Sequence, residues 1–190
     1  MFVLDARQER LVILLLTVVM AVTRIEHFGL SRVVPDASTA IFFMAGLLIA
    51  GPVWFAALLI EALALDITAI KAVGVDPVCI TFGYFMMIPA YAALWYAPRV
   101  LRNGFTPDVA GFGKLVLACA AGTAVFFVLS NIGYYFGGGF SVSMGAAEFA
   151  RRVAQYFPDY LTSTLIYSTI GVLLALGGSY LVSHRNIAAR

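Results

Sequence analysis

Long apolar segments are the feature that most restricts how this chain can fold. A helix needs about 20 apolar residues to cross the roughly 30 Å hydrocarbon core of a bilayer. Six segments approach or reach that length: 11–30, 37–50, 52–70, 78–97, 109–136 and 160–182. Of the 190 residues, 62% are hydrophobic and 12% are charged, which is more apolar surface than a soluble globule of this size can bury. The sequence therefore predicts an all-α, polytopic membrane protein with six transmembrane helices in one membrane domain, residues 1–190.

The connections and the basic residues predict how these segments are arranged. Only Gly51-Pro52 separates the second segment from the third, which predicts a tight hairpin. Arg7 and Arg10 precede the first segment as in a signal peptide, but no small-x-small cleavage site follows Ala21, which favours a retained helix. With the N-terminus inside, the basic residues have a modest inside bias, and we expect both termini in the cytoplasm.

The composition excludes several classes of protein. The two cysteines cannot form a disulfide framework or a four-thiolate metal site. A net charge of +2 without a basic run argues against nucleic acid as a partner. Residues 111–114 are glycine-rich but lack the spacing of a phosphate-binding loop, so any step driven by ATP needs another chain.

Polar residues gather at one predicted depth, just inside the outer surface. They lie near the outer ends of the first, third and fourth segments: Arg24, Glu26, His27, Asp66, Lys71, Asp76, Cys79 and Tyr84. Because ionisable residues within a membrane are costly, they usually face a cavity or one another. We expect a polar, outward-facing pocket, in which Asp66 needs a hydrogen-bond donor. Arg24 and Glu26 either belong to this pocket or pair with other loop charges.

Cys79 has the sharpest chemical implication. It follows Asp76-Pro77-Val78 in the first turn of a predicted helix, whose N-terminus would stabilise a thiolate. A thiolate is a soft ligand suited to a transition metal, whereas the alternative is a small buried hydrophobic residue. Met86 shares the helix face of Cys79, where it either lines the same site or serves ordinary helix packing, and Gly83 leaves room beside the thiol for a bulky group.

For each of three other features, two interpretations are open. His27 is either a hydrogen-bonded interface residue or a ligand. Glu61, near the middle of the membrane, is either neutral and hydrogen-bonded between helices or a gating contact. The flexible loop that begins at Gly137-Gly138-Gly139 is either a lid over the outer mouth or a solvated connector.

Six helices in 190 residues, a tight hairpin and an outward pocket resemble the S-components, the substrate-binding subunits of energy-coupling-factor vitamin transporters. A more specific resemblance rests on Thr-Arg-Ile-Glu-His-Phe-Gly at 23–29, on Asp66, and on Cys79 followed by Tyr84 and Met86. In these residues the chain is similar to the BtuM family of cobalamin transporters, solitary relatives of S-components. The resemblance implies a multi-pass protein of the bacterial inner membrane.

The same resemblance implies that the pocket binds cobalamin from the periplasmic side and mediates its uptake. Cys79 would be an axial ligand of the cobalt, with the nucleotide base displaced. The other implied pocket residues are His27, Asp66, Tyr84, Met86 and Phe42. Cobalamin is then the transported ligand, and we expect no cofactor of the protein's own. Because a thiolate labilises the ligand opposite to it, a further hypothesis is that Cys79 promotes loss of an upper ligand such as cyanide.

One departure from the S-component pattern concerns partners. The first helix of an S-component that docks on an energising ATPase module typically carries Ala-x-x-x-Ala, but this segment offers only Thr17 and Ala21 at that spacing. Since close helix packing needs small residues, the departure argues against such docking, and the protein either acts alone or uses another surface.

The alternative functions are a transporter of the same fold for a different vitamin, a membrane-embedded enzyme and a structural subunit. A serine protease needs a histidine near its serine, and His184 lies beyond the last segment. A thiol oxidoreductase needs a Cys-x-x-Cys pair, which the sequence lacks. A scaffold does not explain the outward cluster of polar residues.

Overall fold

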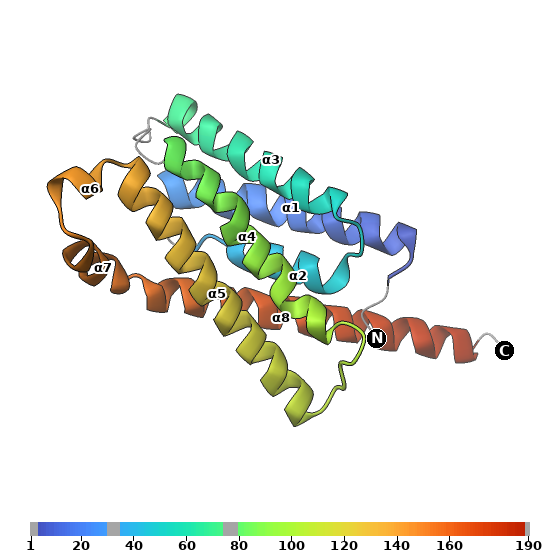
Figure 1. Ribbon diagram of the computed structural model, residues 1–190. Helices are drawn as coiled ribbons and strands as arrows, with labels where there is room; N and C mark the ends of the chain where they lie inside the picture. Colours follow the sequence, from blue (N-terminus) through green and yellow to red (C-terminus); the bar gives the residue numbers. More distant parts are fainter. Residues whose placement is uncertain (1–3, 30–34, 74–79, 189–190) are drawn as a thin grey trace.

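The computed structural model describes residues 4–29, 35–73 and 80–188, without the side chains of residues 25–29, 73 and 179–188. In these residues the structure is helical, with no strand, which confirms the all-α prediction. The α-helices are α1 (Ala6–Gly29), α2 (Ser38–Leu48), α3 (Val53–Thr68), α4 (Met87–Tyr96), α5 (Val109–Gly137), α6 (Phe140–Ser143), α7 (Ala146–Ala154) and α8 (Phe157–Ala188). The π-helical turn η1 (Ala69–Val73) extends α3, and the 3₁₀ segments η3 (Phe82–Met86) and η4 (Ala97–Leu101) flank α4. Figure 1 shows their arrangement.

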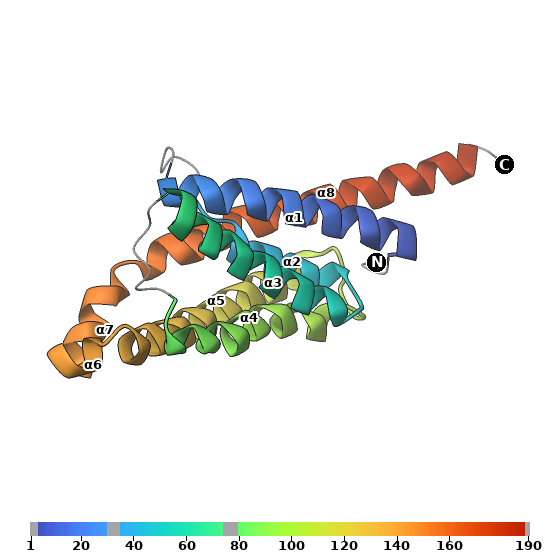
Figure 2. The ribbon, with the colours of Figure 1, turned by 90° about the horizontal axis from the view of Figure 1, so that it is seen from above.

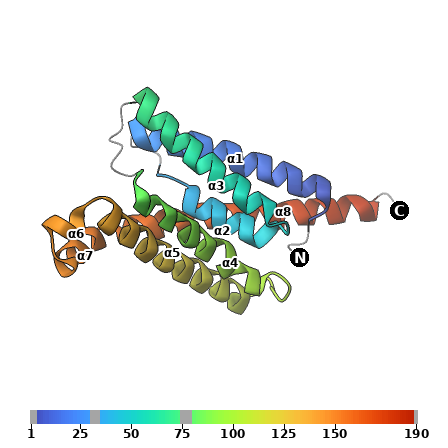
Figure 3. The ribbon, with the colours of Figure 1, turned by 45° about the horizontal axis from the view of Figure 1, so that its top comes forward.

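Helix α2 is the centre of the bundle. All eleven of its residues are buried, and it packs against α1, α3, α4, α5 and α8. Figures 2 and 3 show it between these helices. A helix that is apolar on every side is stable only when neighbours cover every side. One of these contacts requires a glycine, since a Cβ atom on Gly46 would overlap the backbone carbonyl of Trp95 in α4.

The predicted hairpin between the second and third segments is confirmed. Helix α2 ends at Leu48 and α3 begins at Val53, with Pro52 immediately before the first helical residue. Proline suits this position because its fixed φ fits the start of a helix, where its missing N–H is not needed. The short connection makes α2 and α3 neighbours and places α3 beside α1.

The fourth predicted segment, 78–97, is not one continuous α-helix. In its described part, η3 precedes α4 and η4 follows it. The space that the sequence suggested beside Gly83 is filled by α5, because a Cβ atom there would overlap the backbone of Gly133. The absence of a side chain therefore serves close packing between η3 and α5. Since 3₁₀ turns align residues three apart, the α-helical spacing assumed between Cys79 and Met86 does not hold through η3.

The connection that begins at Gly137-Gly138-Gly139, predicted to be a flexible loop, contains two short helices. Gly139, with a φ of 77°, turns the chain into α6 and then α7. The aromatic ring of Phe149 in α7 lies 4.9 Å from that of Tyr135 and 5.7 Å from that of Phe140. These aromatic contacts hold the two short helices at the end of α5 and explain why the glycine-rich connection is ordered into helices (Figure 1).

Among the described residues, three helical stretches are long and apolar enough to cross a membrane, so the six predicted spans are not all confirmed: Val53–Ala72, Val109–Gly137 and Phe157–Gly178. Helix α2, with 11 residues, is only about 17 Å long and falls short of a full crossing. Helix α1 begins and α8 ends at the same end of the bundle (Figure 1). Large apolar side chains such as Leu14, Leu15, Leu173 and Leu174 are exposed on the outside of the bundle, as expected for a surface that faces lipid.

Candidate functional site

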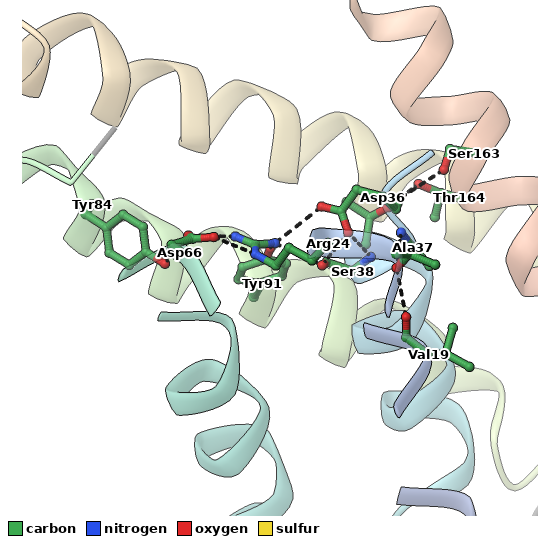
Figure 4. A network of polar contacts seen from close by, with 12 residues as sticks. Val19, Arg24, Asp36, Ala37, Ser38, Asp66, Tyr84, Tyr91, Ser163 and Thr164 are labelled. Carbon is green, nitrogen blue, oxygen red and sulfur yellow. Dashed lines mark hydrogen bonds and ion pairs between the residues drawn. The ribbon is translucent and has the colours of Figure 1, made fainter. Parts of the chain in front are cut away.

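A buried ion pair joins α1 to α3. Arg24 is 6% exposed and Asp66 is 8% exposed. The guanidinium donates from Nε to Asp66 Oδ1 at 2.6 Å and from its second terminal nitrogen to Asp66 Oδ2 at 2.8 Å. Figure 4 shows this two-bonded arrangement. A planar guanidinium matches both oxygens of a carboxylate, so the pair fixes the relative position of the two helices.

The third nitrogen of Arg24 binds groups from two further elements. Its Nη1 lies 2.9 Å from Ser38 Oγ at the start of α2 and 3.1 Å from the hydroxyl of Tyr91 in α4. It also lies 3.3 Å from Asp36 Oδ2, just before α2. Asp36 in turn accepts a hydrogen bond from the backbone N–H of Ser38 at 2.9 Å, which stabilises the start of α2. One arginine therefore holds four elements together.

Tyr84 completes the cluster. Its hydroxyl, in η3, donates to Asp66 Oδ2 at 2.8 Å. Asp66 therefore has the donors that the sequence led us to expect, and two of the predicted site residues, Asp66 and Tyr84, lie together. We call Arg24, Asp36, Ser38, Asp66, Tyr84 and Tyr91 the Arg24 cluster.

The Arg24 cluster holds two carboxylates and one guanidinium. Asp36 is the more exposed of the carboxylates, with 28% of its side chain accessible, whereas 10% of the Asp66 side chain is accessible. Because the two acids outnumber the arginine, the cluster has an excess negative charge. It can attract a cationic group or accept hydrogen bonds from a polar ligand that approaches from the side of Asp36.

The remaining predicted site residues are placed differently. Phe42 is fully buried, and its ring stacks on that of Tyr91 with centroids 3.9 Å apart, so it touches the Arg24 cluster from the apolar side. Met86 is half-buried in η3, and its side chain lies where a Cβ atom on Gly133 would fall. Cys79 lies outside the described residues. His27 belongs to α1, but its side chain lies outside the described part.

Sequence reasoning missed the central role of Arg24 and the participation of Tyr91. The sequence left open whether Arg24 pairs with loop charges or lines a pocket, and the structure pairs it with Asp66, 42 positions away. A charged residue near the end of an apolar helix was the available signal, since such a charge needs a partner. Tyr91 gave no signal, because a tyrosine within an apolar segment is common in a core.

A second polar layer ties α1 and α8 to the chain around the start of α2. The backbone N–H of Ala37 donates to Thr23 Oγ1 at 3.2 Å, and Ser163 Oγ donates to the carbonyl of Asp36 at 3.0 Å. The hydroxyls of Thr39 and Thr164 lie 2.7 Å apart. These bonds satisfy the polar groups where α2 begins inside the bundle, which an apolar surrounding requires.

Two hollows in the described part of the chain share no residue with the Arg24 cluster. One lies between α1 and α3, where Arg10, Thr17, Trp54 and Glu61 are among the lining residues. The other, between α2, α5 and α8, is mostly apolar and includes Cys119. The Cys119 thiol is 2% exposed and lies 3.9 Å from Ser168 Oγ, which fits the interpretation of a packed core residue.

Among the described residues, no group of three or more His, Cys, Asp or Glu side chains is arranged to hold a metal ion. Comparison of the chain with protein-family models and with curated proteins finds no match.

Proposed function

We propose that this protein is a six-span, BtuM-like transporter that binds cobalamin in an outward-facing pocket beside the Arg24 cluster and mediates its uptake across a bacterial inner membrane. The supporting observation is the hydrogen bond between Asp66 and Tyr84, two residues on which the family resemblance rests. They come from different elements, 18 positions apart, and both belong to the Arg24 cluster.

The chain topology supports a place for Cys79 near this cluster. The Asp66–Tyr84 bond closes the stretch of chain that contains residue 79, because Asp66 precedes it and Tyr84 follows it. Cys79 lies five positions before Tyr84, and a fully extended chain of that length spans at most about 17 Å. The thiol of Cys79 is therefore within reach of a molecule as large as a corrinoid that contacts the Arg24 cluster.

The proposed chemistry is ligand exchange at the cobalt of the bound substrate. The thiolate of Cys79 occupies one axial position in place of the nucleotide base. Electron donation from sulfur weakens the bond to the ligand on the opposite face. Cyanide then leaves as an anion with the electron pair of its bond to cobalt, and the oxidation state of the metal is unchanged. The hydrogen bond from Tyr84 to Asp66 links η3 to the rest of the Arg24 cluster.

The test is the visible absorption spectrum of the purified full-length protein after incubation with cyanocobalamin. Wild type is compared with Cys79→Ala and with Cys119→Ala, which removes the other thiol from a packed site that shares no residue with the Arg24 cluster. We expect a bound pigment with a shifted spectrum in wild type and in Cys119→Ala, and loss of the shift in Cys79→Ala.

The other outcomes separate the parts of the proposal. Bound corrinoid with the same spectrum in all three proteins would keep the transporter and overturn cobalt–sulfur coordination. A cyanide-bound spectrum that does not change during prolonged incubation would overturn ligand removal. Absence of bound corrinoid in wild type would overturn cobalamin as the substrate and favour a different vitamin.

A further inference from the structure

A carboxyl group that the Arg24 cluster does not use lies in the groove between α1 and α3. Glu61 is the ninth residue of the 20-residue span Val53–Ala72, about 12 Å from its start along the helix axis and so near the middle of the bilayer. The residues that line this groove, which we call the α1–α3 groove, are Arg10, Ile13, Leu14, Thr17, Trp54, Ala57, Leu58 and Glu61.

The hydrogen bonds of Glu61 are incomplete for an ionised carboxylate. Thr17, on α1, lines the groove together with the carboxyl group of Glu61. Oxygen Oε1 is buried and has no partner among the described residues. A carboxylate has about four acceptor positions, and one left without donors in an apolar setting is strongly destabilised. A protonated carboxyl group carries no net charge and needs far fewer hydrogen-bond donors.

The charged neighbours of Glu61 do not supply the missing hydrogen bonds. Arg10 is the cationic residue in the lining of the groove, but it lies two helical turns before Thr17 on α1, and its Nε donates to the carbonyl of Ala6 at 3.1 Å. Asp66 lies further along α3 and is bound by Arg24. Helix α2, which packs against both α1 and α3, has no titratable side chain.

We propose that the α1–α3 groove is a proton-binding site, in which Glu61 carries a proton at neutral pH while the groove faces lipid. The proton is released to water only when the groove is hydrated. Such a site responds to a pH difference across the membrane, because movement of α1 relative to α3 changes which environment the carboxyl meets. The inference does not depend on cobalamin as the substrate.

The first test is infrared spectroscopy of the full-length protein in lipid at neutral pH. The spectrum of wild type minus that of Glu61→Gln isolates this one carboxyl group. We expect the stretching band of a protonated carboxyl in the difference spectrum, with its loss at strongly alkaline pH. We expect Thr17→Val to move that loss to higher pH, since the hydroxyl of Thr17 lines the same groove and its removal makes the surroundings of the carboxyl group more apolar. A carboxylate band in place of the protonated band at neutral pH would overturn the proposal.

A second measurement uses the unaltered protein, so it does not depend on how well the variant folds. A lipid-soluble carbodiimide adds to a protonated carboxyl group and leaves the reagent attached as an acylurea, which peptide mass mapping locates. We expect addition at Glu61 that decreases as the pH rises, and none at Glu148, whose carboxylate is bound by exposed Arg151 and Arg152. Labelling of Glu148 in preference to Glu61 at neutral pH would contradict a stored proton in the groove.

Discussion

Replacement of Asp66 by asparagine tests the central contact of the fold. The change keeps the shape of the side chain but removes the charge that binds Arg24 at 2.6 and 2.8 Å. Arg24 is 6% exposed and cannot turn to water, although Asp36 at 3.3 Å still offers a negative charge. Removal of one partner from a buried ion pair costs about 3–5 kcal/mol, and the remaining contact with Asp36 places the expected loss near the lower limit, about 3 kcal/mol.

That loss corresponds to a change of roughly a hundredfold in the unfolding equilibrium constant. The assay is denaturant unfolding of the full-length protein in detergent micelles, followed by the loss of helical circular dichroism. A matched control is Glu148→Gln, which makes the same chemical change where the arginine partners are 77% and 62% exposed. We expect no measurable effect there, because exposed ion pairs add little to stability.

A double variant separates the ion pair from the loss of packing. Replacement of Arg24 by methionine and Asp66 by leucine removes both charges together, and a buried pair replaced by apolar residues often leaves stability unchanged or improved. We therefore expect the double variant to be more stable than either single variant. The reasoning about this buried pair is wrong if Asp66→Asn lowers the free energy of unfolding by less than about 0.5 kcal/mol. It is also wrong if the stability losses of Arg24→Met alone and Asp66→Leu alone simply add in the double variant.

Two further predictions concern backbone packing and pH. Gly46→Ala should destabilise the protein by about 1–3 kcal/mol, because the added methyl group meets the backbone of Trp95. Gly113 has open space around it, so Gly113→Ala should stabilise α5 slightly. Equal shifts of the thermal unfolding temperature in both variants would contradict the contact between Gly46 and Trp95. The backbone N–H of Gly111 donates to the Asp108 carboxylate at 2.7 Å, and this bond lowers the pKa of Asp108 below its ordinary 3.8. The ionised Asp108 side chain therefore stabilises the start of α5 fully above pH 3.8. This stabilisation is lost as the pH falls through the lower pKa of the folded state. The amide proton shift of Gly111 in an NMR titration should therefore stay constant down to that lower pKa, and a midpoint above 3.8 would contradict the cap.

The apolar segments predicted the position of most helices because each helix must satisfy its own backbone in lipid. The hairpin at Pro52 followed from local conformational preferences, and these act within a few residues. The need of Asp66 for a donor was also evident, since a carboxylate in an apolar helix is costly wherever it lies. The identity of that donor was not, because Arg24 lies 42 positions away and many polar groups were candidates.

Predictions that depended on ideal helix spacing failed where neighbouring elements altered the backbone. Gly83 was interpreted as space for a ligand, whereas the bundle uses it for close contact between η3 and α5. The glycine-rich connection after α5 was predicted to be a flexible loop, and the structure adds two short helices there, stabilised by aromatic packing around Phe149. A pattern within one segment does not contain the packing surface that another segment presents.

By itself, the sequence determined the helical class, the approximate helix positions, the tight hairpin and the requirement that charges within the apolar segments find partners. These are local properties or consequences of lipid as a solvent. Only the tertiary structure decided that Arg24 binds Asp66, that α2 is enclosed on every side, and that Glu61 and Thr17 line the α1–α3 groove together. The physical reason is that hydrogen bonds and close contacts between distant segments depend on relative helix position and rotation, which the packing of the whole bundle sets.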